Sequence, residues 1–437
     1  MESKVQVKES SFIAPSEATP TKKLWLSPFD QVLANRGHTP LVHLYRANPD
    51  ATAFFDVVRL KEALAKALVA FYPLAGRLDA DVEGRTEIKC NNEGVLFVVA
   101  CADLGDDLVF KPSPELRRIF IPRIEPSTII LAIQVTFLKC GGVVLGTAVH
   151  HAAVDGSCFF HFLQTWSAIS RDGDSAAVEL PCHDRTLLRP RSPPVVDPSA
   201  LSVLFPKVTF VSQPSGGPTA TEVFTISKHQ VATLKRLCGG GAISTFCSVS
   251  ALVWRCACVA RRVAPHARVR LSFPANVRRS LRPPLPDRYF GNALVWLGVT
   301  GVARDVALGS SLVSVAGRVA GAVARMDDDV VRSAIDYFEL AETDGRPLKG
   351  SMPETDLRIT SWLGMPVYDV DFGWGKPRNM SRAESVRGGF VYLMDDGPAG
   401  ESGGGGAVRV VMCMEATNMK TFEGLLYANI TNKSAKL

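Results

Sequence analysis

The chain has 437 residues, of which 46% are hydrophobic and 21% charged, and its net charge is +6. This length exceeds what one ordinary core holds and predicts two domains of roughly 200 residues each. The basic residues form no block, which disfavours a nucleic-acid-binding protein. No apolar run reaches the roughly 18 residues of a membrane span, and the polar N-terminus lacks a secretory signal. We therefore expect a globular protein of the cytosol.

Both halves of the chain are predicted to mix strands with helices. Strands are expected from β-rich or alternating runs at 5–13, 41–45, 129–138, 143–149, 222–226, 268–273, 358–363 and 408–414. Helices are expected from apolar residues at helical spacing in 59–70, 157–169, 228–237, 244–263, 306–326, 329–340 and 421–428. A segment rich in Pro, Ser and Gly separates the halves, as in a linker. We predict an N-terminal domain at 1–186, a crossover linker at 187–221 and a C-terminal domain at 222–437.

The clearest chemistry lies where the strand at 143–149 meets the helix at 157–169. The sequence there is His150-His151-Ala152-Ala153-Val154-Asp155-Gly156. A His at a strand end can present a ring nitrogen to a cleft, and an Asp four positions later can hold the turn or orient the ring. Gly156 gives the backbone freedom to turn into the helix. Taken alone, the same pattern also fits a half-buried His beside a capping Asp.

A metal site formed by His150, His151 and Asp155 is a further interpretation of this segment. Adjacent residues of a strand point to opposite faces, so the two His side chains cannot easily face one ion. No further cluster of His and Cys completes a ligand set in the sequence. We therefore expect no bound metal.

The second feature is the segment Asp371-Phe372-Gly373-Trp374-Gly375. A carboxylate followed by two glycines can close a tight loop by accepting hydrogen bonds from backbone N–H groups. Trp374 can lie against a site and donate its indole N–H. By itself, this segment is typical of a structural loop at a domain junction.

A central H-x-x-x-D-G and a later D-F-G-W-G, in this order and at this separation, together resemble the plant BAHD acyltransferases. Other stretches resemble the hydroxycinnamoyltransferase branch of that family, among them LWLS at 24–27, FYPLAGR at 71–77 and SW-x-x-x-P at 361–366. The resemblance covers essentially the whole chain. It implies two chloramphenicol-acetyltransferase-like α/β domains, each a mixed sheet with flanking helices, joined by a long crossover loop and separated by a solvent channel.

The resemblance also implies roles for the two motifs. His151 is expected to be the general base, with Asp155 and Gly156 shaping its turn. Asp371 is expected to be essential to catalysis through an indirect role, in a loop near the CoA end with Gly373, Trp374 and Gly375. Acyl-CoA is then a co-substrate and no cofactor is bound permanently. The protein is expected to act as a monomer on small molecules, without nucleic acid or a membrane span.

An acyl thioester is already activated, so the reaction needs a base and an oxyanion donor. His151, neutral at pH 7, takes the proton of the acceptor, and the Trp374 N–H, the Thr39 hydroxyl or a backbone N–H stabilises the oxyanion. A helix start and cationic side chains suit the CoA phosphates, and the candidates are Ser244, Thr245, Arg255 and Arg278. Solvated helix faces explain these residues equally well, and Arg255 also fits a buried structural role.

The residues expected to line the acceptor or acyl pocket are Thr39, Leu41, His43, Gly364 and Trp374. Gly364 stands where shikimate-type relatives carry an Arg that grips a carboxylate, and Leu41 and His43 replace a Ser and a Tyr. Loss of this Arg predicts an amine acceptor such as putrescine, agmatine or tryptamine, which receives a hydroxycinnamoyl or benzoyl group. One alternative is shikimate, quinate or another alcohol, with a different Arg as the clamp. The other is a BAHD-like protein that binds ligands without catalysis.

Overall fold

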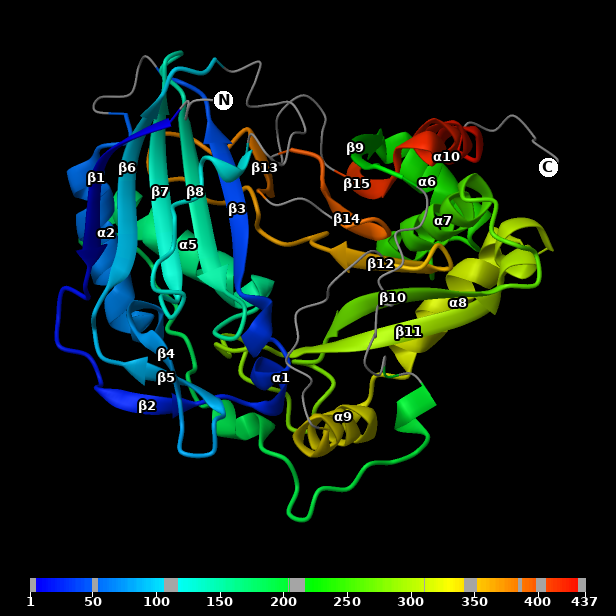
Figure 1. Ribbon diagram of the computed structural model, residues 1–437, viewed down its shortest axis with the longest axis horizontal. Coiled ribbons are helices and arrows are strands. Elements are labelled where there is room, and N and C mark those ends of the chain that lie inside the picture. Colours follow the sequence, from blue (N-terminus) through cyan, green and yellow to red (C-terminus); the bar gives the residue numbers. More distant parts are fainter. Residues whose placement is uncertain are drawn as a thin grey trace.

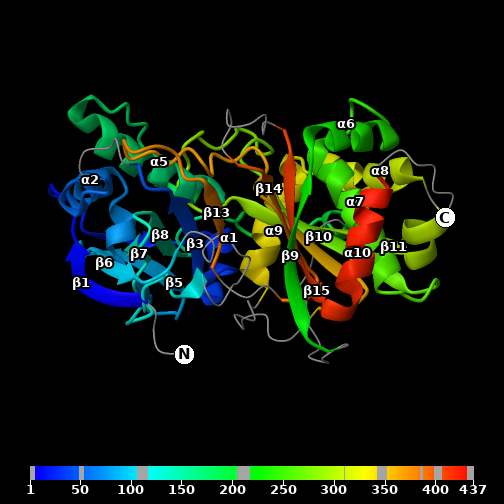
Figure 2. The same ribbon diagram turned by 90° about the horizontal axis from the view of Figure 1, so that it is seen from above.

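The computed structural model describes residues 5–48, 54–105, 117–202, 204, 217–309, 311–341, 352–383, 387–397 and 406–430. These ranges form two six-stranded mixed sheets, a small three-stranded sheet and the helices around them. The two large sheets lie side by side, each with its own hydrophobic core (Figures 1 and 2). The chain therefore has the expected α/β class with two sheet-containing domains.

The first sheet comes mainly from the first half of the chain, in the order β1-β6-β7-β8-β3-β13. Its strands are β1 (Val5–Ile13), β6 (Val95–Ala102), β7 (Leu131–Leu138), β8 (Val143–His150), β3 (His38–Tyr45) and β13 (Asn379–Arg382). Helices α2 (Val57–Ala70) and α5 (Gly156–Asp172) lie together against one face of this sheet (Figure 1). Leu60, Leu64 and Leu68 of α2 recur at helical spacing and are fully buried, so burial of this apolar stripe fixes the helix on the sheet.

The small sheet lies below the first one in Figure 1 and consists of β2 (Lys22–Trp25), β5 (Thr86–Cys90) and β4 (Arg77–Ala80). Two short helices, α1 (Pro28–Gln31) and η1 (Ala34–Arg36), connect β2 to β3. A third, η2 (Tyr72–Ala75), follows α2, because Pro73 lacks the N–H that the helix would need.

The second sheet has the order β11-β10-β12-β14-β15-β9. Its strands are β11 (Leu294–Val302), β10 (Arg268–Asn276), β12 (Asp356–Ser361), β14 (Phe390–Asp395), β15 (Val408–Glu415) and β9 (Thr219–Ile226). Its helices are α6 (Lys228–Leu237), α7 (Thr245–Ala260), α8 (Leu312–Ala324), α9 (Asp328–Leu340) and α10 (Ala416–Ala428). Helix α7 is apolar on almost all sides and is the most buried of these helices. Within the described ranges no helix has the length and apolar character to cross a bilayer.

Most predicted elements are confirmed, with changes at their bounds. The helix expected at 306–326 is interrupted, since a single turn, η6 (Asp305–Gly309), precedes α8, whose first turn is capped by the Ser311 side chain. Strand β9 begins at Thr219, inside the predicted linker at 187–221. The described part of that linker contains the end of the short helix η4 (Arg185–Leu188) and the whole of η5 (Ala200–Ser202), and residues 203 and 205–216 lie outside the described residues.

One segment of the second half belongs to the first sheet. Strand β13 pairs antiparallel with β3, with Met380 opposite His43. The side chains of Trp362, Phe372 and Trp374 are buried in the core of the first sheet. The predicted C-terminal domain at 222–437 therefore does not correspond to one sheet, because residues between β12 and β14 fasten the two halves together.

Candidate active site

A cavity of about 330 Å³ lies between the two large sheets. Strands β3 and β8 contribute their ends, together with the turn after β8, and β11, β12 and β14 contribute from the other side. His151 lines this cavity. The first motif therefore opens onto the junction between the domains, where ligand sites commonly form.

His151 is positioned by its backbone. It follows the last residue of β8, and its N–H donates to the Gly37 carbonyl at 3.0 Å, continuing the pairing of β8 with β3. The ring Nδ1 is buried without a hydrogen-bond partner. With the proton on Nδ1, the Nε2 lone pair is free for the cavity that His151 lines.

The surroundings keep the His151 ring neutral. Burial lowers its pKa to about 4, and the cations of Arg36 and Arg382 add to this effect against the smaller opposing effects of its own carbonyl and Asp155. The side chain is half-buried rather than sealed, because one side faces the cavity. At pH 7 the imidazole is therefore unprotonated and able to accept a proton.

His150 lies on the other side of the backbone from His151 and does not line the cavity. Its Nδ1 accepts the N–H of Ala152 at 3.3 Å, and its ring meets that of His38 edge-on at 5.0 Å. Burial lowers its pKa to about 3. In the part of the chain that the structure describes, no three His, Cys, Asp or Glu side chains gather as metal ligands.

Asp155 holds the turn after His151. Its carboxylate receives two hydrogen bonds from Arg278, at 2.8 and 3.0 Å, one from the Ala293 N–H at 3.1 Å and one from the Cys158 N–H at 3.2 Å. Burial raises the pKa of Asp155, but Arg278 and these N–H groups lower it by more, so the carboxylate stays ionised. None of these bonds reaches His151. Of the two roles left open for Asp155, the geometry supports holding the turn against the second half of the chain.

A second buried network that the sequence reasoning missed supports the same turn. Asn292 donates to the His151 carbonyl at 2.9 Å and to the Asp30 carboxylate at 2.8 Å. Arg185 donates to the Ala153 carbonyl at 2.6 Å and pairs with Asp30 at 2.8 Å. The local signal was Ser27-x-x-Asp30, a capping-box pattern that α1 uses. The backbone on both sides of the catalytic candidate is therefore fixed by buried polar contacts.

The second motif forms a closed loop away from the cavity. The Asp371 carboxylate accepts the N–H groups of Gly373 and Gly375 at 2.8 and 2.9 Å, and both glycines have positive φ, +101° and +102°. Trp374 stacks on Phe55 with ring centroids 5.1 Å apart. None of these residues lines the cavity. The expectation that Trp374 belongs to the pocket needs correction, because this stacking holds it in the first core and Trp362 lines the cavity instead.

This geometry predicts the effect of replacing Asp371 with Ala. The loop loses two backbone hydrogen bonds, each worth about 1 kcal/mol, so we expect a destabilisation of about 1–3 kcal/mol in urea unfolding. Because Asp371 does not reach the cavity, kcat per folded molecule should fall far less than on loss of His151. Asp371→Asn, which keeps one acceptor oxygen, is the matched variant and should lie between wild type and Ala. A loss of turnover in D371A as deep as that of a His151 variant, with unchanged stability, would contradict this structural role.

The residues expected in the acceptor pocket divide into two groups. Thr39 and Leu41 line the cavity. His43 lies on the same face of β3 but further along, where it is fully buried and its pKa falls to about 4, so it is not a pocket residue. Gly364 is exposed in a turn with φ +72°, where its N–H donates to Asp395 at 2.8 Å, and it too lies outside the lining.

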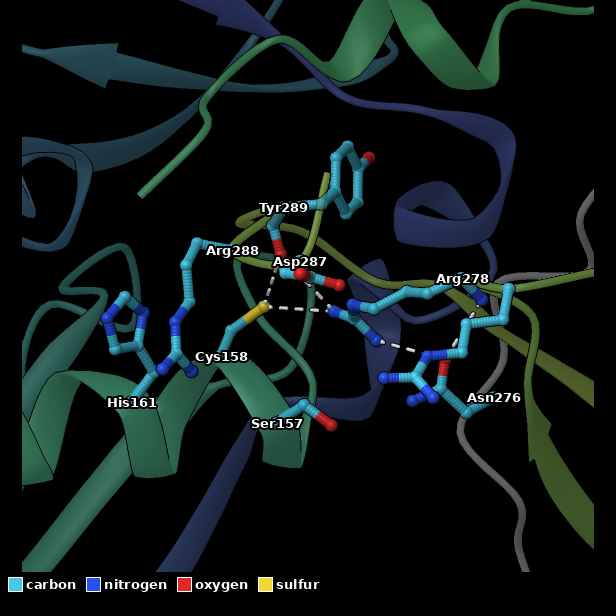
Figure 3. Close-up of a pocket in the computed structure, with 9 residues that line it drawn as sticks. Ser157, Cys158, His161, Asn276, Arg278, Asp287, Arg288 and Tyr289 are labelled. Atoms are coloured by element: carbon cyan, nitrogen blue, oxygen red, sulfur yellow. Dashed lines mark hydrogen bonds between the residues drawn. The ribbon is translucent and has the colours of Figure 1, made fainter. Parts of the chain in front are cut away.

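The candidates for the CoA phosphates are dispersed. Ser244 caps α7 by accepting the Cys247 N–H at 3.1 Å, and Arg255 donates to the Val306 carbonyl at 3.0 Å. These two residues and Thr245 line neither this cavity nor its neighbour. Arg278 borders the neighbouring cavity, of about 420 Å³, where its guanidinium points toward Cys158 (Figure 3). Since Arg278 binds Asp155 through both terminal nitrogens, its first task is structural.

Sequence reasoning missed four arginines that line the cavity with His151, namely Arg36, Arg358, Arg382 and Arg387. One signal was present, since Arg358 interrupts the apolar run of its strand between Leu357 and Ile359. Asp155 is the single carboxylate among the described residues that line the cavity, and it already forms an ion pair with Arg278. The wall around the base is therefore cationic.

Comparisons with known proteins agree with this architecture. The model of the Transferase family matches residues 3–428. Putrescine hydroxycinnamoyltransferase 1 of Oryza sativa subsp. japonica is 42% identical, covering 98% of this chain and 99% of the relative. Shikimate O-hydroxycinnamoyltransferase of Nicotiana tabacum is 38% identical, covering 97% and 99%. The crystal structure of vinorine synthase superposes with a TM-score of 0.77 over 98% of both chains, and at 24% identity this likeness concerns the fold.

The match with the family model spans nearly the whole chain, and the two relatives are similar along nearly their whole lengths. The names of both relatives describe the transfer of a hydroxycinnamoyl group. The chain therefore belongs to the Transferase family of BAHD acyltransferases and is an acyl-transferring enzyme.

Proposed function

We propose that this enzyme transfers a hydroxycinnamoyl group from CoA to a small acceptor, with His151 as the general base. The observation that carries the proposal is the placement of His151, whose unengaged Nε2 faces a cavity between the two sheets. The cavity is lined by apolar and aromatic side chains such as Phe160, Trp362 and Tyr392, which suit the ring of an aromatic acyl group.

The reaction follows from the placement of these groups. Nε2 of His151 takes the proton from the acceptor N–H or O–H as its nitrogen or oxygen bonds to the thioester carbon. The electron pair of the carbonyl moves to its oxygen, for which the Thr39 hydroxyl and the Trp362 indole N–H, both on the cavity wall, are the donors. Collapse of this intermediate breaks the C–S bond, and the His151 imidazolium returns the proton to the CoA thiolate.

Two acceptor classes follow from different observations. The 42% identical putrescine hydroxycinnamoyltransferase supports the amine predicted from Gly364. The cationic lining around His151 instead favours an acceptor that carries a negative charge, because a diamine would bring two further positive charges to the arginines. We therefore propose that the nucleophile of the acceptor is an amine or a hydroxyl group.

Release of free CoA tests the proposed function. The purified protein is incubated with p-coumaroyl-CoA and a panel of amines, amino acids and hydroxy acids, and free thiol is measured with a chromogenic reagent. We expect acceptor-dependent thiol release and an amide or ester of p-coumarate in the same stoichiometry by mass spectrometry. A chain that binds p-coumaroyl-CoA but releases no thiol with any acceptor is a binding protein, and the proposal falls.

The lowered pKa of His151 predicts the pH dependence of catalysis. A base acts in its neutral form, so the acid limb of kcat/KM should fall at the pKa of about 4, below the ordinary value of 6.5. The stability of the fold should change in the same direction. Because the pKa of His151 is lower in the folded protein, protonation favours the unfolded chain, and the free energy of unfolding falls as the pH drops from 6.5 towards 4. Circular dichroism at each pH separates the two effects. An acid limb near 6.5 in a folded protein would contradict the assigned environment.

A further inference from the structure

Among the described residues, Arg358 is a buried cation that has no counterion. It is 4% exposed, yet it borders the cavity of His151 from β12. Its guanidinium lies over the ring of Trp296, with Cζ 3.4 Å from the ring centroid, and 5.6 Å from the centroid of Phe390. No carboxylate of the described residues pairs with it, and its side chain donates no hydrogen bond to them. Its pKa is strongly lowered, by burial first and then by the nearby charges of Arg36 and Arg387.

Two further arginines reach the same place from other elements. Arg36 ends η1 on the side of the first sheet, and Arg387 precedes β14 on the side of the second. Both are exposed, although burial lowers both pKa values, that of Arg36 to about 10. Both residues line the cavity of His151. Neither pairs with a carboxylate of the described chain, so three cations converge on one space.

Such a cluster is unfavourable without an anion. A guanidinium loses strong hydration when it is buried, and like charges in a water-poor site repel one another. The aromatic faces of Trp296 and Phe390 hold the Arg358 group by stacking and leave its N–H edge for a ligand. We propose that Arg36, Arg358 and Arg387 bind a carboxylate of the acceptor while His151 activates its nucleophile. This inference rests on the proposed function and names the acceptor class.

The position of the cluster favours the acceptor over CoA as the source of the anion. His151 and the three arginines line the same cavity of about 330 Å³, so the cluster and the base share one small space. The phosphates of CoA are separated from its sulfur by the pantetheine arm, so a thioester at His151 holds them away from this space. An acceptor has no such arm. A molecule with an amine or hydroxyl and a carboxylate a few bonds apart fits both contacts.

This arrangement replaces the missing clamp at position 364. Gly364 lies in an exposed turn outside the cavity lining, and open space surrounds the place where its side chain would begin. Arg358 lies six residues earlier on β12, at the cavity wall itself. The acceptor is thus an anionic amine or hydroxy acid, such as an aromatic amino acid or a shikimate-like acid, rather than a free diamine.

Matched acceptors that differ in one charge test the inference. The pairs are tryptophan and tryptamine, ornithine and putrescine, and shikimate and methyl shikimate, each with p-coumaroyl-CoA. For the pair that reacts fastest, we expect the carboxylate-bearing member to have the higher kcat/KM, by about 10- to 100-fold, as for hydrogen bonds to a charged group. In Arg358→Gln this preference should shrink to near unity, while KM for p-coumaroyl-CoA stays within about twofold.

Further variants test the same preference for a carboxylate-bearing acceptor in case R358Q is unstable. Arg36→Gln and Arg387→Gln remove exposed groups and should each reduce the preference with an unchanged melting temperature, and Arg358→Lys should restore part of it. Arg332→Gln, which removes a surface pair with Asp328 on α9, is the matched control and should leave the preference unchanged. Faster turnover of putrescine than of every anionic acceptor overturns the inference.

The source of the anion has its own test. If R358Q raises KM for p-coumaroyl-CoA and dephospho-CoA thioesters abolish the difference from wild type, the cluster binds a CoA phosphate and the acceptor assignment is wrong. Failure of the proposed function is separate, since the wild-type enzyme would then release no thiol with any acceptor.

Discussion

Replacing His151 with Ala is expected to lower kcat by about 10²- to 10⁴-fold, the usual contribution of a general base. The residual rate comes from binding and from the oxyanion donors, which the change leaves in place. The variant should fold normally, because the backbone N–H still donates to Gly37 and the ring makes no hydrogen bond that the structure needs. Thiol release measures kcat, and circular dichroism with thermal melting verifies the fold.

Two variants sharpen this experiment. His150→Asn is the matched control, since its side-chain oxygen can still accept the Ala152 N–H and position 150 does not line the cavity, so most activity should remain. Added imidazole should partly rescue H151A, because the lost ring leaves a space beside the reacting atoms, whereas it should not stimulate the wild type. Near-wild-type turnover in H151A would remove the base from the mechanism, and the cavity would then need another proton acceptor.

Local patterns were sufficient to predict much of this molecule. Two β-rich runs placed the strands β7 and β8, and helical spacing placed α2 and α5. The position of His151 at a strand-to-helix turn followed directly from these two elements. Where local preference and tertiary context agree, single-sequence reasoning succeeds, because each residue already favours the conformation that the fold requires.

The remaining features depend on contacts between distant residues. Arg278 seemed suited to a phosphate, yet it binds Asp155, 123 positions away in sequence, and nothing local to either residue encodes that pairing. Strand β13 carries no sign that it will join the first sheet, since an edge strand of four residues has little pattern of its own. The cluster of Arg36, Arg358 and Arg387 likewise brings together η1, β12 and the turn before β14. Tertiary packing, rather than local propensity, creates these sites.

The pair between Asp155 and Arg278 carries the second large prediction. Asp155 is 2% exposed and Arg278 8%, and the two join the turn after β8 to the second half of the chain. Replacing Asp155 with Ala leaves a buried guanidinium without its partner and removes the cap of α5. We expect a loss of about 3–5 kcal/mol in unfolding free energy, the usual cost of breaking a buried pair from one side. Urea unfolding followed by tryptophan fluorescence measures it.

The double variant D155A/R278M separates the ion pair from the turn that it holds. Removing both charges abolishes the buried unpaired cation, so the double variant should be more stable than D155A alone, with a coupling energy of at least about 1 kcal/mol. Its turnover should nevertheless stay below that of the wild type, because a methyl side chain at position 155 cannot accept the N–H groups of Cys158 and Ala293 that fix the turn beside His151. Asp155→Asn retains an acceptor oxygen for these groups and should therefore keep more activity than D155A. Strictly additive changes in unfolding free energy would show that the pair does not couple the two halves. A fully active double variant would show that the pair does not position the base.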